Sequence, residues 1–423
     1  MNFTVVTLGC PKNTVDSRHL IEALIKEGFS YVEEFKKADF VFVNTCCFIN
    51  DAKEESIDEI LTAAKFKDHR KLIVFGCLAE RYREEIKKEI SEVDALFGVN
   101  ETESIVKFMK QFKDFKNSQS VPYTMEPPSY RYLKIADGCS RRCTFCIIPA
   151  IRGNFRSTEP EKILKEAESF VSSAVKELIL VAQDITQYGK EYKGYNLTNL
   201  LNDLCSISGD FWIRLLYLYP TDIDENLIKA IGEQEKIVKY LDIPMQHSEE
   251  RILRLMGRRG TKREYLKKIK QIREAIPGVT LRSTFIVGFP TETEEEFQKL
   301  VDFIEEVQFD RLGVFKYSKE EGTVAYNLKG QIPDNVKQRR YDEIMSKQAV
   351  ISLEKNRALV GKEYYALIDY IDVDLAIARL YCHAPEIDGV VILEDVSTLK
   401  AGDKVKVLIK EAYEYDLKGV IVS

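Results

Sequence analysis

The stretch Asp137–Ala150, DGCSRRCTFCIIPA, contains the cysteines Cys139, Cys143 and Cys146 in the spacing Cys-x3-Cys-x2-Cys. Three thiolates within eight residues can bind one iron–sulfur cluster, which normally takes four cysteines, one for each iron. Three cysteines leave one iron with an open coordination site, where chemistry can take place. Zinc favours paired Cys-x2-Cys ligands and a fourth ligand at a fixed spacing, but the next cysteine is Cys205. The spacing therefore favours a cluster over zinc.

This spacing, with Phe145 immediately before the last cysteine, resembles that of the radical S-adenosylmethionine (SAM) superfamily. The resemblance implies a 4Fe–4S cluster on Cys139, Cys143 and Cys146 whose open iron binds SAM. It also implies that an electron from the cluster cleaves SAM and releases a 5′-deoxyadenosyl radical. The Phe145 ring is expected to lie against the adenine of SAM.

Length and composition limit the class of protein. A chain of 423 residues predicts two or three domains, and a hydrophobic content of 45% supplies real cores. The net charge of −6 disfavours a protein whose main role is to bind a nucleic-acid backbone. The sequence shows no signal peptide and no apolar run of membrane-spanning length. We therefore expect a cytoplasmic protein with no membrane partner, whose cysteines are reduced thiols.

Residues 1–120 alternate β-rich runs with helical patterns, which predicts a doubly wound parallel sheet. Cys10, Cys46 and Cys77 each follow a β-rich run by two or three residues. The carboxyl ends of parallel strands share the edge of the sheet where such folds bind ligands. A single cysteine is more often a small core residue, but the shared position predicts a second three-cysteine site. Spacing does not choose between Cys46 and its neighbour Cys47.

Two strings in this domain, LGCPKNTVDS (Leu8–Ser17) and VNTCCFINDAKEES (Val43–Ser56), resemble the N-terminal domain of the methylthiotransferases. The resemblance implies that Cys10, Cys46 and Cys77 bind an auxiliary 4Fe–4S cluster and that Cys47 does not. It also places Asn13, Asp16 and Ser17 in a family motif, although helix capping is an adequate alternative explanation for Asp16 or Ser17.

Residues 130–340 form the second predicted domain, after a Pro- and Ser-rich linker at Asn117–Ser129. Strands alternating with helices predict a partial TIM-like (β/α)6 barrel with its site at the C-terminal strand ends. Thr158–Glu161 and Thr293–Glu296 are each predicted to be a capping box that begins a helix. The six predicted strands are Tyr130–Ala136, Glu177–Ala182, Trp212–Leu218, Tyr240–Ile243, Val279–Val287 and Arg311–Tyr317.

Polar residues and one glycine follow several of these strands and are candidates for binding SAM: Gln183, Asp184, Gln246, His247 and Gly288. A glycine lets the backbone approach a ligand closely. Four arginines, Arg141, Arg142, Arg152 and Arg156, flank the cysteine loop. They are interpreted as a solvated basic surface or, alternatively, as the mouth of a site for an acidic substrate.

Residues 360–423 contain four short β-type runs: Tyr364–Ile368, Val390–Leu393, Val405–Ile409 and Gly419–Val422. They predict a small all-β barrel, which resembles a TRAM domain, known as an RNA-binding module. From position 361 to 423 there are 7 Lys and Arg against 12 Asp and Glu, a net charge of 7 − 12 = −5. A phosphate-binding barrel should be basic. Direct RNA binding by this domain is therefore not favoured, and a basic protein partner is.

Strings along the whole chain resemble the RimO-type branch of the methylthiotransferases, among them Asp242–Thr261, Arg311–Ala325 and Ala384–Gly389. The resemblance implies an enzyme that adds a methylthio group to the β-carbon of an aspartate in the basic small-subunit ribosomal protein S-twelve. It implies two 4Fe–4S clusters, SAM as cosubstrate, an external electron donor and a sulfur source. The alternatives are a transfer-RNA adenosine methylthiotransferase and a non-catalytic iron–sulfur electron carrier or sensor. Cys205 and Cys382 are interpreted as packing residues, and Thr291 stands where the family more often has glycine.

Overall fold

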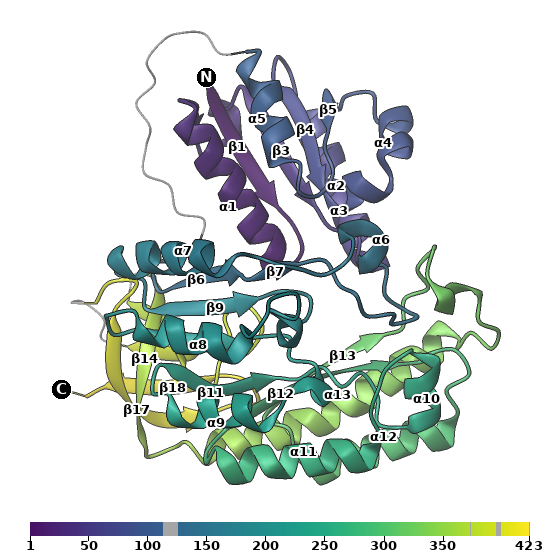
Figure 1. Cartoon of the computed structure of the whole chain (residues 1–423), viewed down its shortest axis with the longest axis vertical. Coiled ribbons are helices and arrows are strands. Elements are labelled where there is room, and N and C mark those ends of the chain that lie inside the picture. Colours follow the sequence, from purple (N-terminus) through teal and green to yellow (C-terminus); the bar gives the residue numbers. More distant parts are fainter. Residues whose placement is uncertain (113–125, 373, 395–398, 423) are drawn as a thin grey trace. The chain divides into compact units, whose positions relative to one another are not determined.

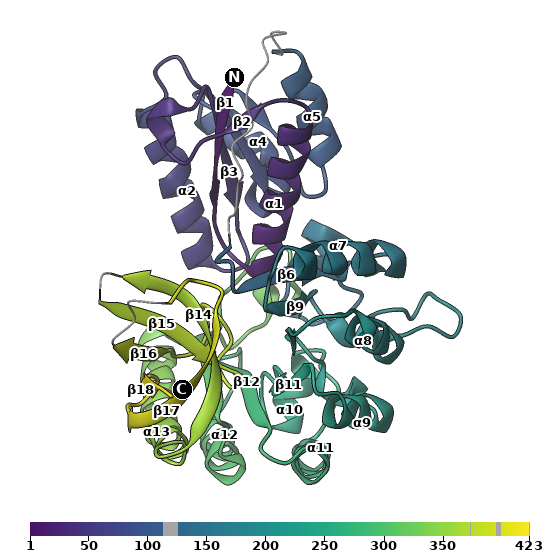
Figure 2. The ribbon, with the colours of Figure 1, turned by 90° about the vertical axis from the view of Figure 1, so that its left-hand side faces the viewer.

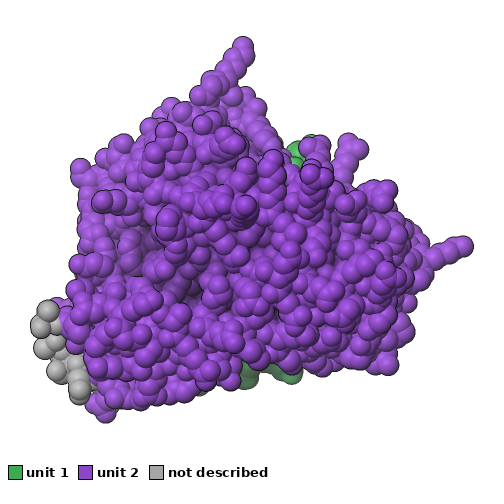
Figure 3. All heavy atoms as spheres, turned by 90° about the horizontal axis from the view of Figure 1, so that it is seen from below, with its two compact units in different colours: residues 1–125, 138–141, 146–154 green, residues 126–137, 142–145, 155–423 purple. Residues whose placement is uncertain are grey.

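The computed structural model describes residues 1–112, 126–372, 374–394 and 399–422 (Figure 1). The chain forms two compact units, coloured separately in Figure 3. Unit 1 comprises Met1–Met125, Gly138–Arg141 and Cys146–Asn154, and unit 2 comprises the remaining segments up to Ser423. The predicted linker, Asn117–Ser129, lies outside the described residues except for its last four. No helix in the described ranges is long and apolar enough to cross a membrane.

Unit 1 contains a five-stranded sheet in the order β2-β1-β3-β4-β5, in which all pairs are parallel. This confirms the predicted doubly wound sheet. The order places β1 beside β3 and β3 beside β4, so that the three strands followed by cysteines are neighbours. The strands are β1 (Asn2–Thr7), β2 (Ser30–Tyr31), β3 (Phe40–Thr45), β4 (Lys71–Gly76) and β5 (Ala95–Leu96).

The helices of unit 1 cover both faces of this sheet. One face buries Phe3, Phe42 and Phe75 with Leu20 of α1, and the other buries residues such as Val43 with α2, α3 and α6. The helices are α1 (Pro11–Lys26), α2 (Asn50–Lys65), α3 (Cys77–Arg81), α4 (Arg83–Glu89), α5 (Thr102–Lys110) and α6 (Ile148–Arg152). Alternate side chains of each strand thus point to opposite cores, as strand geometry requires.

Unit 2 contains a six-stranded parallel sheet in the order β13-β12-β11-β10-β9-β6, surrounded by helices (Figure 2). This confirms the predicted (β/α)6 partial barrel. The strands are β6 (Tyr130–Lys134), β9 (Glu177–Val181), β10 (Trp212–Leu215), β11 (Ile237–Asp242), β12 (Thr280–Val287) and β13 (Arg311–Lys316). The helices are α7 (Pro160–Ser172), α8 (Leu197–Ser206), α9 (Glu225–Glu233), α10 (Glu250–Leu255), α11 (Lys262–Ala275) and α12 (Glu294–Val307).

Only one of the two predicted capping boxes forms. At α12 the Thr293 side chain accepts from the Glu296 backbone, and the Glu296 side chain accepts from the Thr293 backbone. The box predicted at Thr158 is wrong, because α7 begins at Pro160 and its N-cap, Glu159, makes no side-chain cap. Proline suits the first helical turn, where its missing N–H would have no helical partner. The N–H of Thr158 instead donates to the carbonyl of Ile135.

After the long helix α13 (Asp334–Arg357), five strands close into a small barrel in the order β14-β15-β16-β18-β17. The barrel strands are β14 (Glu363–Asp372), β15 (Leu375–Leu380), β16 (Val391–Glu394), β17 (Lys404–Ala412) and β18 (Leu417–Ile421). The sequence pattern predicts four of these five strands and misses β15. The predicted all-β barrel is confirmed.

The barrel is joined to the six-stranded sheet by buried charges within unit 2. Both oxygens of Glu177, at the start of β9, accept from arginines: Oε1 from Arg214 Nε at 2.6 Å and Oε2 from Arg379 Nη1 at 2.7 Å. Arg379 lies on β15 of the barrel and Arg214 on β10 of the sheet. Tyr240 of β11 donates to Asp388 at 2.7 Å. Glu177 is the first residue of β9, at the opposite end of that strand from the edge where the site is expected.

Candidate active site

The three scattered cysteines of unit 1 lie at one edge of its sheet. Cys10 follows β1, Cys46 follows β3 and Cys77 follows β4. Cys10 and Cys77 are each preceded by a glycine with positive φ, 93° at Gly9 and 95° at Gly76. L-residues with side chains rarely adopt this conformation. The repeated pattern of strand, glycine and cysteine turns the chain at the carboxyl end of each strand.

The side chains themselves converge on Asn13. Its Oδ1 lies 3.9 Å from Cys10 Sγ and 4.0 Å from Cys77 Sγ. A Cβ built on Gly9 would lie 2.6 Å from Cys46 Cβ and 2.9 Å from Cys46 Sγ, so Cys46 borders the same space. The sequence prediction that three distant cysteines share one edge is therefore matched by their placement. Their role as cluster ligands stays a prediction.

Positive charge surrounds these thiols. Burial raises the pKa of Cys10, but Lys12 and Arg152 outweigh it and lower this pKa below its usual value. Burial raises the pKa of Cys46 and brings that of Cys77 to about 12, with Arg152 opposing the rise at both. A metal binds the thiolate form, so nearby cations favour the form that coordinates iron.

The chemistry of the donor set fits an iron–sulfur cluster, because such clusters are held by cysteine thiolates. Across the described ranges, no three His, Cys, Asp or Glu side chains are grouped as ligands of one metal ion are. A cluster places each thiolate on a different iron and therefore spreads its ligands. Three cysteine sulfurs around a common space, with a buried cation beside them, are compatible with such a cluster.

Cys47 points into the core of unit 1. Its side chain is 0% exposed and packs in the hydrophobic cluster that contains Val43 and Ile60. Cys46, by contrast, is held by Ser56: the Cys46 N–H donates to Ser56 Oγ, and Ser56 Oγ donates to the Cys46 carbonyl, both at 2.9 Å. This packing supports the prediction that Cys46 and not Cys47 is the ligand.

The Cys139–Cys146 loop is flanked by a short antiparallel ribbon, β7 (Ala136–Asp137) with β8 (Arg156–Ser157). In unit 1, the Cys139 N–H donates to the Gly153 carbonyl at 3.0 Å. Gly138 has φ of 74°, and a Cβ there would lie 2.3 Å from the Asn154 carbonyl oxygen. The loop is therefore closed by backbone contacts on either side of the cysteines.

The unit 2 part of the loop is fixed by Thr144. Its N–H donates to the Met256 carbonyl at 2.9 Å, and its own carbonyl accepts from the Ala325 N–H at 2.8 Å. The ring of Phe145 packs on a cluster of residues that includes Met256 and Phe289. The expected contact of Phe145 with adenine stays a prediction.

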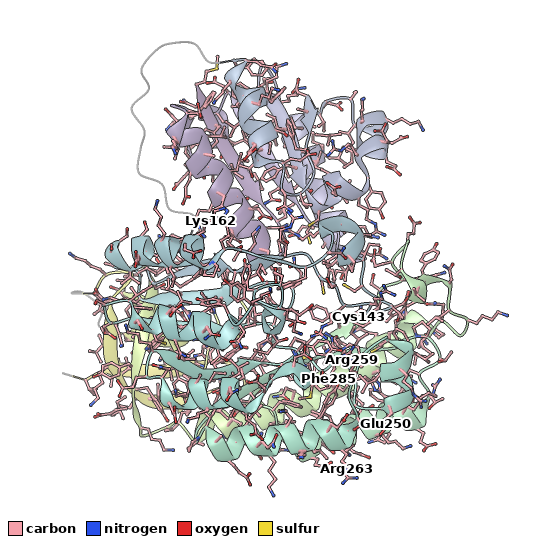
Figure 4. The ribbon with its side chains drawn as sticks, in the orientation of Figure 1. Cys143, Lys162, Glu250, Arg259, Arg263 and Phe285 are labelled. Carbon is pink, nitrogen blue, oxygen red and sulfur yellow. The ribbon has the colours of Figure 1, made fainter. Side chains whose placement is uncertain are left out.

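Arg258 lies beside Cys143 and was not predicted from the sequence. Its Nη1 is 4.0 Å from Cys143 Sγ, and its guanidinium carbon lies 4.3 Å from the centre of the Tyr219 ring. Figure 4 labels Cys143 and also Arg259, the residue that follows Arg258 in the sequence. Arg258 therefore places a positive charge beside one of the three cysteines of the loop. The only sequence signal is the pair of arginines after Gly257, which local patterns do not connect to a loop more than 100 residues earlier.

The predicted SAM-binding residues are in different situations. Gln183 donates to Asp137 Oδ1 at 3.1 Å. Asp184 is buried and caps its own loop, accepting from the Thr186 N–H at 3.0 Å and from Gln187 Nε2 at 2.9 Å. This hydrogen bonding holds the Asp184 side chain in place, and its expected contact with SAM stays a prediction. His247 is also buried and contacts Glu292 Oε1 through Nε2 at 3.3 Å.

Gln246 and Gly288 follow β11 and β12, and both have positive φ, 73° and 71°. A Cβ on Gly288 would lie 2.3 Å from Cγ of Lys337, so packing against α13 already requires the glycine. Non-glycine residues with positive φ follow β10, β11 and β12, at Tyr217, Gln246 and Thr291. Strained residues of this kind concentrate at functional sites, and these mark the carboxyl edge of the sheet.

Comparison with known families matches three successive parts of the chain. The model of "Uncharacterized protein family UPF0004" matches residues 2–98, that of the "Radical SAM superfamily" matches 133–304, and that of the "TRAM domain" matches 360–422. Solved structures share the fold at low sequence identity. The radical SAM methyltransferase TsrM of Kitasatospora setae aligns with a TM-score of 0.55 at 12% identity, over 95% of this chain and 81% of its own. Fold and cysteine loop together define a radical SAM enzyme.

Full-length relatives define the branch. The ribosomal protein uS12 methylthiotransferase RimO of Thermodesulfovibrio yellowstonii is 79% identical over 423 residues, covering 100% of both chains. The proteins of the same name from Thermoanaerobacter sp. and Thermotoga maritima are 45% and 44% identical; the alignments cover 99% and 100% of this chain, and the same shares of theirs. The chain belongs to the RimO family of radical SAM methylthiotransferases.

Proposed function

We propose that this protein is a ribosomal protein uS12 methylthiotransferase that modifies the β-carbon of one aspartate. The reaction replaces a C–H bond by a C–S bond that carries a methyl group. A side-chain base cannot remove this hydrogen, because the C–H bond is not acidic enough. When bound, a 4Fe–4S cluster would supply the electron that cleaves SAM to a radical able to abstract it, and a second cluster would supply the sulfur. SAM provides the methyl group, and an external donor provides the electron.

The chain's own residues would hold these groups in two sets. Cys139, Cys143 and Cys146 would bind the SAM-associated cluster, and Cys10, Cys46 and Cys77 would bind the auxiliary cluster. The single observation that best supports two clusters is that the second set follows three adjacent parallel strands. Phe145, Gln183, Asp184, Gln246 and Gly288 are proposed to contact SAM. We propose three domains: residues 1–120 for the auxiliary cluster, 130–340 for the radical SAM chemistry and 360–423 for the TRAM-like barrel.

The charge of the last domain favours a basic protein over RNA as the partner. Its net charge of −5 would repel phosphates and attract lysine and arginine side chains. Its surface also exposes aromatic rings: Tyr365, Tyr370, Tyr413 and Tyr415. Aromatic and cationic groups attract each other. The barrel is therefore proposed to contact uS12, and the sulfur source and electron donor to be separate partners.

The test is mass spectrometry of uS12 and of transfer RNA after reaction with cluster-reconstituted protein, SAM and a reductant. We expect one methylthio group on a single aspartate of uS12. The Cys143→Ala variant should give none, and Cys205→Ala should react as the parent does. Modification of transfer RNA with uS12 unchanged would reverse the substrate assignment. Failure of the reduced protein to form 5′-deoxyadenosine would favour an electron carrier.

The ligand assignment has its own test in the iron content of variants. Replacing Cys10, Cys46 or Cys77 by alanine should reduce the iron bound per chain by about half, because one of two equal clusters is lost. Cys47→Ala should leave the iron content unchanged. Loss of iron in Cys47→Ala with full iron in Cys46→Ala would exchange the roles of these two residues.

A further inference from the structure

Arg152 is a buried cation at the edge of the unit 1 sheet. It is the last residue of α6, six residues after Cys146, and its side chain is 1% exposed. The sequence places it among the arginines of a solvated surface or a site mouth, and the structure corrects this. Ile147 and Ile151 anchor α6 in the same core as Val43, which draws the arginine inward. A buried guanidinium is costly unless charges and hydrogen bonds compensate for it.

The guanidinium of Arg152 contacts the residue on which the cysteines converge. Its Nη2 donates to Asn13 Oδ1 at 2.8 Å and lies 2.9 Å from Asp16 Oδ2. The same Oδ1 atom lies 3.9 Å and 4.0 Å from the sulfurs of Cys10 and Cys77. The amide nitrogen of Asn13 is used elsewhere, because it donates to the carbonyls of Leu8 and Thr45. The orientation of Asn13 is therefore fixed from both ends.

We propose that Arg152 is a positioning residue for the auxiliary cluster, an inference that rests on the proposed binding of that cluster by Cys10, Cys46 and Cys77. Thiols lose their protons when they bind iron. The sulfurs of Cys10 and Cys77 can then no longer donate to Asn13 Oδ1. Without Arg152, this oxygen would have no donor and would be repelled by the negatively charged sulfurs. Arg152 keeps a donor on this oxygen and places a positive charge beside the site.

The positive charge of Arg152 should change the reduction potential of the auxiliary cluster, which a role in packing alone would not do. The reduction potential of an iron–sulfur cluster depends on the net charge and hydrogen bonds around it. Reduction adds an electron, so a nearby cation stabilises the reduced form. Arg152 therefore raises the potential of the auxiliary cluster, and Asp16, which pairs with Arg152, lowers it. Arg152 follows Cys146, a proposed ligand of the SAM-associated cluster, and thereby adjusts the reduction potential of the auxiliary cluster.

The experiment uses the full chain with Cys139, Cys143 and Cys146 replaced by alanine, so that only the auxiliary cluster forms. Iron content and the midpoint potential from a redox titration followed by electron paramagnetic resonance are measured. Adding Arg152→Gln should shift the potential to a more negative value, and Arg152→Lys should shift it less. Asp16→Asn should shift it to a more positive value. Arg83→Gln, which replaces an arginine of unit 1 whose side chain is 39% exposed and pairs with Glu101, is the control and should leave it unchanged.

Arg152→Gln and Asp16→Asn break the same ion pair but should shift the potential in opposite directions. This difference separates an effect of charge from an effect of lost structure. If Arg152→Gln keeps its iron with an unchanged potential, the inference is overturned. If Arg152→Gln loses its fold or its iron, Asp16→Asn decides: a positive shift supports the inference, and no shift or a negative one overturns it. Absence of iron in the three-cysteine variant itself would instead contradict the proposed auxiliary cluster.

Discussion

The glycines before Cys10 and Cys77 set the direction of the two cysteines. Gly9 combines a φ of 93° with close contact, because an added Cβ would lie 2.6 Å from Cys46 Cβ. We expect Gly9→Ala to lower the iron content of the reconstituted protein toward that of Cys10→Ala. Gly194→Ala is the control, since Gly194 has φ of 78° with nothing within 4 Å of an added Cβ. It introduces backbone strain of about 1 kcal/mol without a clash and should keep full iron. Equal loss in both variants would show that general destabilisation is responsible.

Residues could be predicted from the sequence only where a local pattern determines their place. Cys10, Cys46 and Cys77 were placed at one edge because each follows a predicted parallel strand, and chain direction alone brings such ends together. Arg152 and Arg258 could not be found in this way. Their positions depend on the packing of α6 and on the loop after α10, which involve contacts far apart in sequence.

At the scale of elements, strands buried on both faces were predicted well because they are continuous apolar runs. β2 has two residues, Ser30–Tyr31, and no run to detect. β15 was missed because its sequence, LAIARL, interrupts the apolar pattern with Arg379, whose charge is neutralised by distant partners on β9 and β14. The segment Thr158–Glu161 matches the sequence pattern of a capping box, but no box forms because α7 begins at Pro160.

The two Thr-x-x-Glu sequences offer a direct comparison of cap energies. Thr293→Ala removes the acceptor for the Glu296 N–H at α12 and should lower the free energy of unfolding by about 1 kcal/mol. Thr158→Ala removes no cap and only a long hydrogen bond, 3.4 Å from Thr158 Oγ1 to the Lys134 carbonyl, and should cost about 0.5 kcal/mol or less. Urea denaturation of the two variants measures both values. Equal costs would mean that the cap at α12 adds nothing to stability.

The same cap predicts a pH dependence. Burial would raise the pKa of Glu296, but hydrogen bonds from Arg251 and Thr293 lower it to about 2. A carboxyl whose pKa is lower in the folded state stabilises the fold above its unfolded pKa of about 4.3 and loses this contribution as pH falls. The stability difference between the parent and Glu296→Gln should therefore be constant above pH 5 and shrink between about 4.5 and 2. Circular dichroism in urea at several pH values measures it, and a difference independent of pH would contradict this pKa.

At the scale of the whole molecule, the small barrel and the six-stranded sheet of unit 2 share a buried carboxylate. Glu177 is 0% exposed, and although burial would raise its pKa, Arg214 and Arg379 lower it, so the group is ionised when the protein is folded. One arginine comes from the sheet and the other from the barrel. The carboxylate can satisfy both only while the two parts are joined, which predicts that they unfold together.

Glu177→Gln tests this coupling. The change leaves two buried guanidinium groups without their shared counter-charge, and removing one member of a buried ion pair costs about 3 kcal/mol or more. We expect a loss of that size in urea denaturation. Asp210→Asn breaks the more exposed Lys404 pair at 2.6 Å, which also joins barrel and sheet, and should cost less than about 1 kcal/mol. Because Arg214, which also donates to the Tyr381 carbonyl, would lose its partner Glu177, Glu177→Gln should also expose Tyr381 to proteolysis before the sheet unfolds. A single transition with a loss no larger than that of Asp210→Asn would mean that contacts other than the Glu177 ion pairs join the two parts.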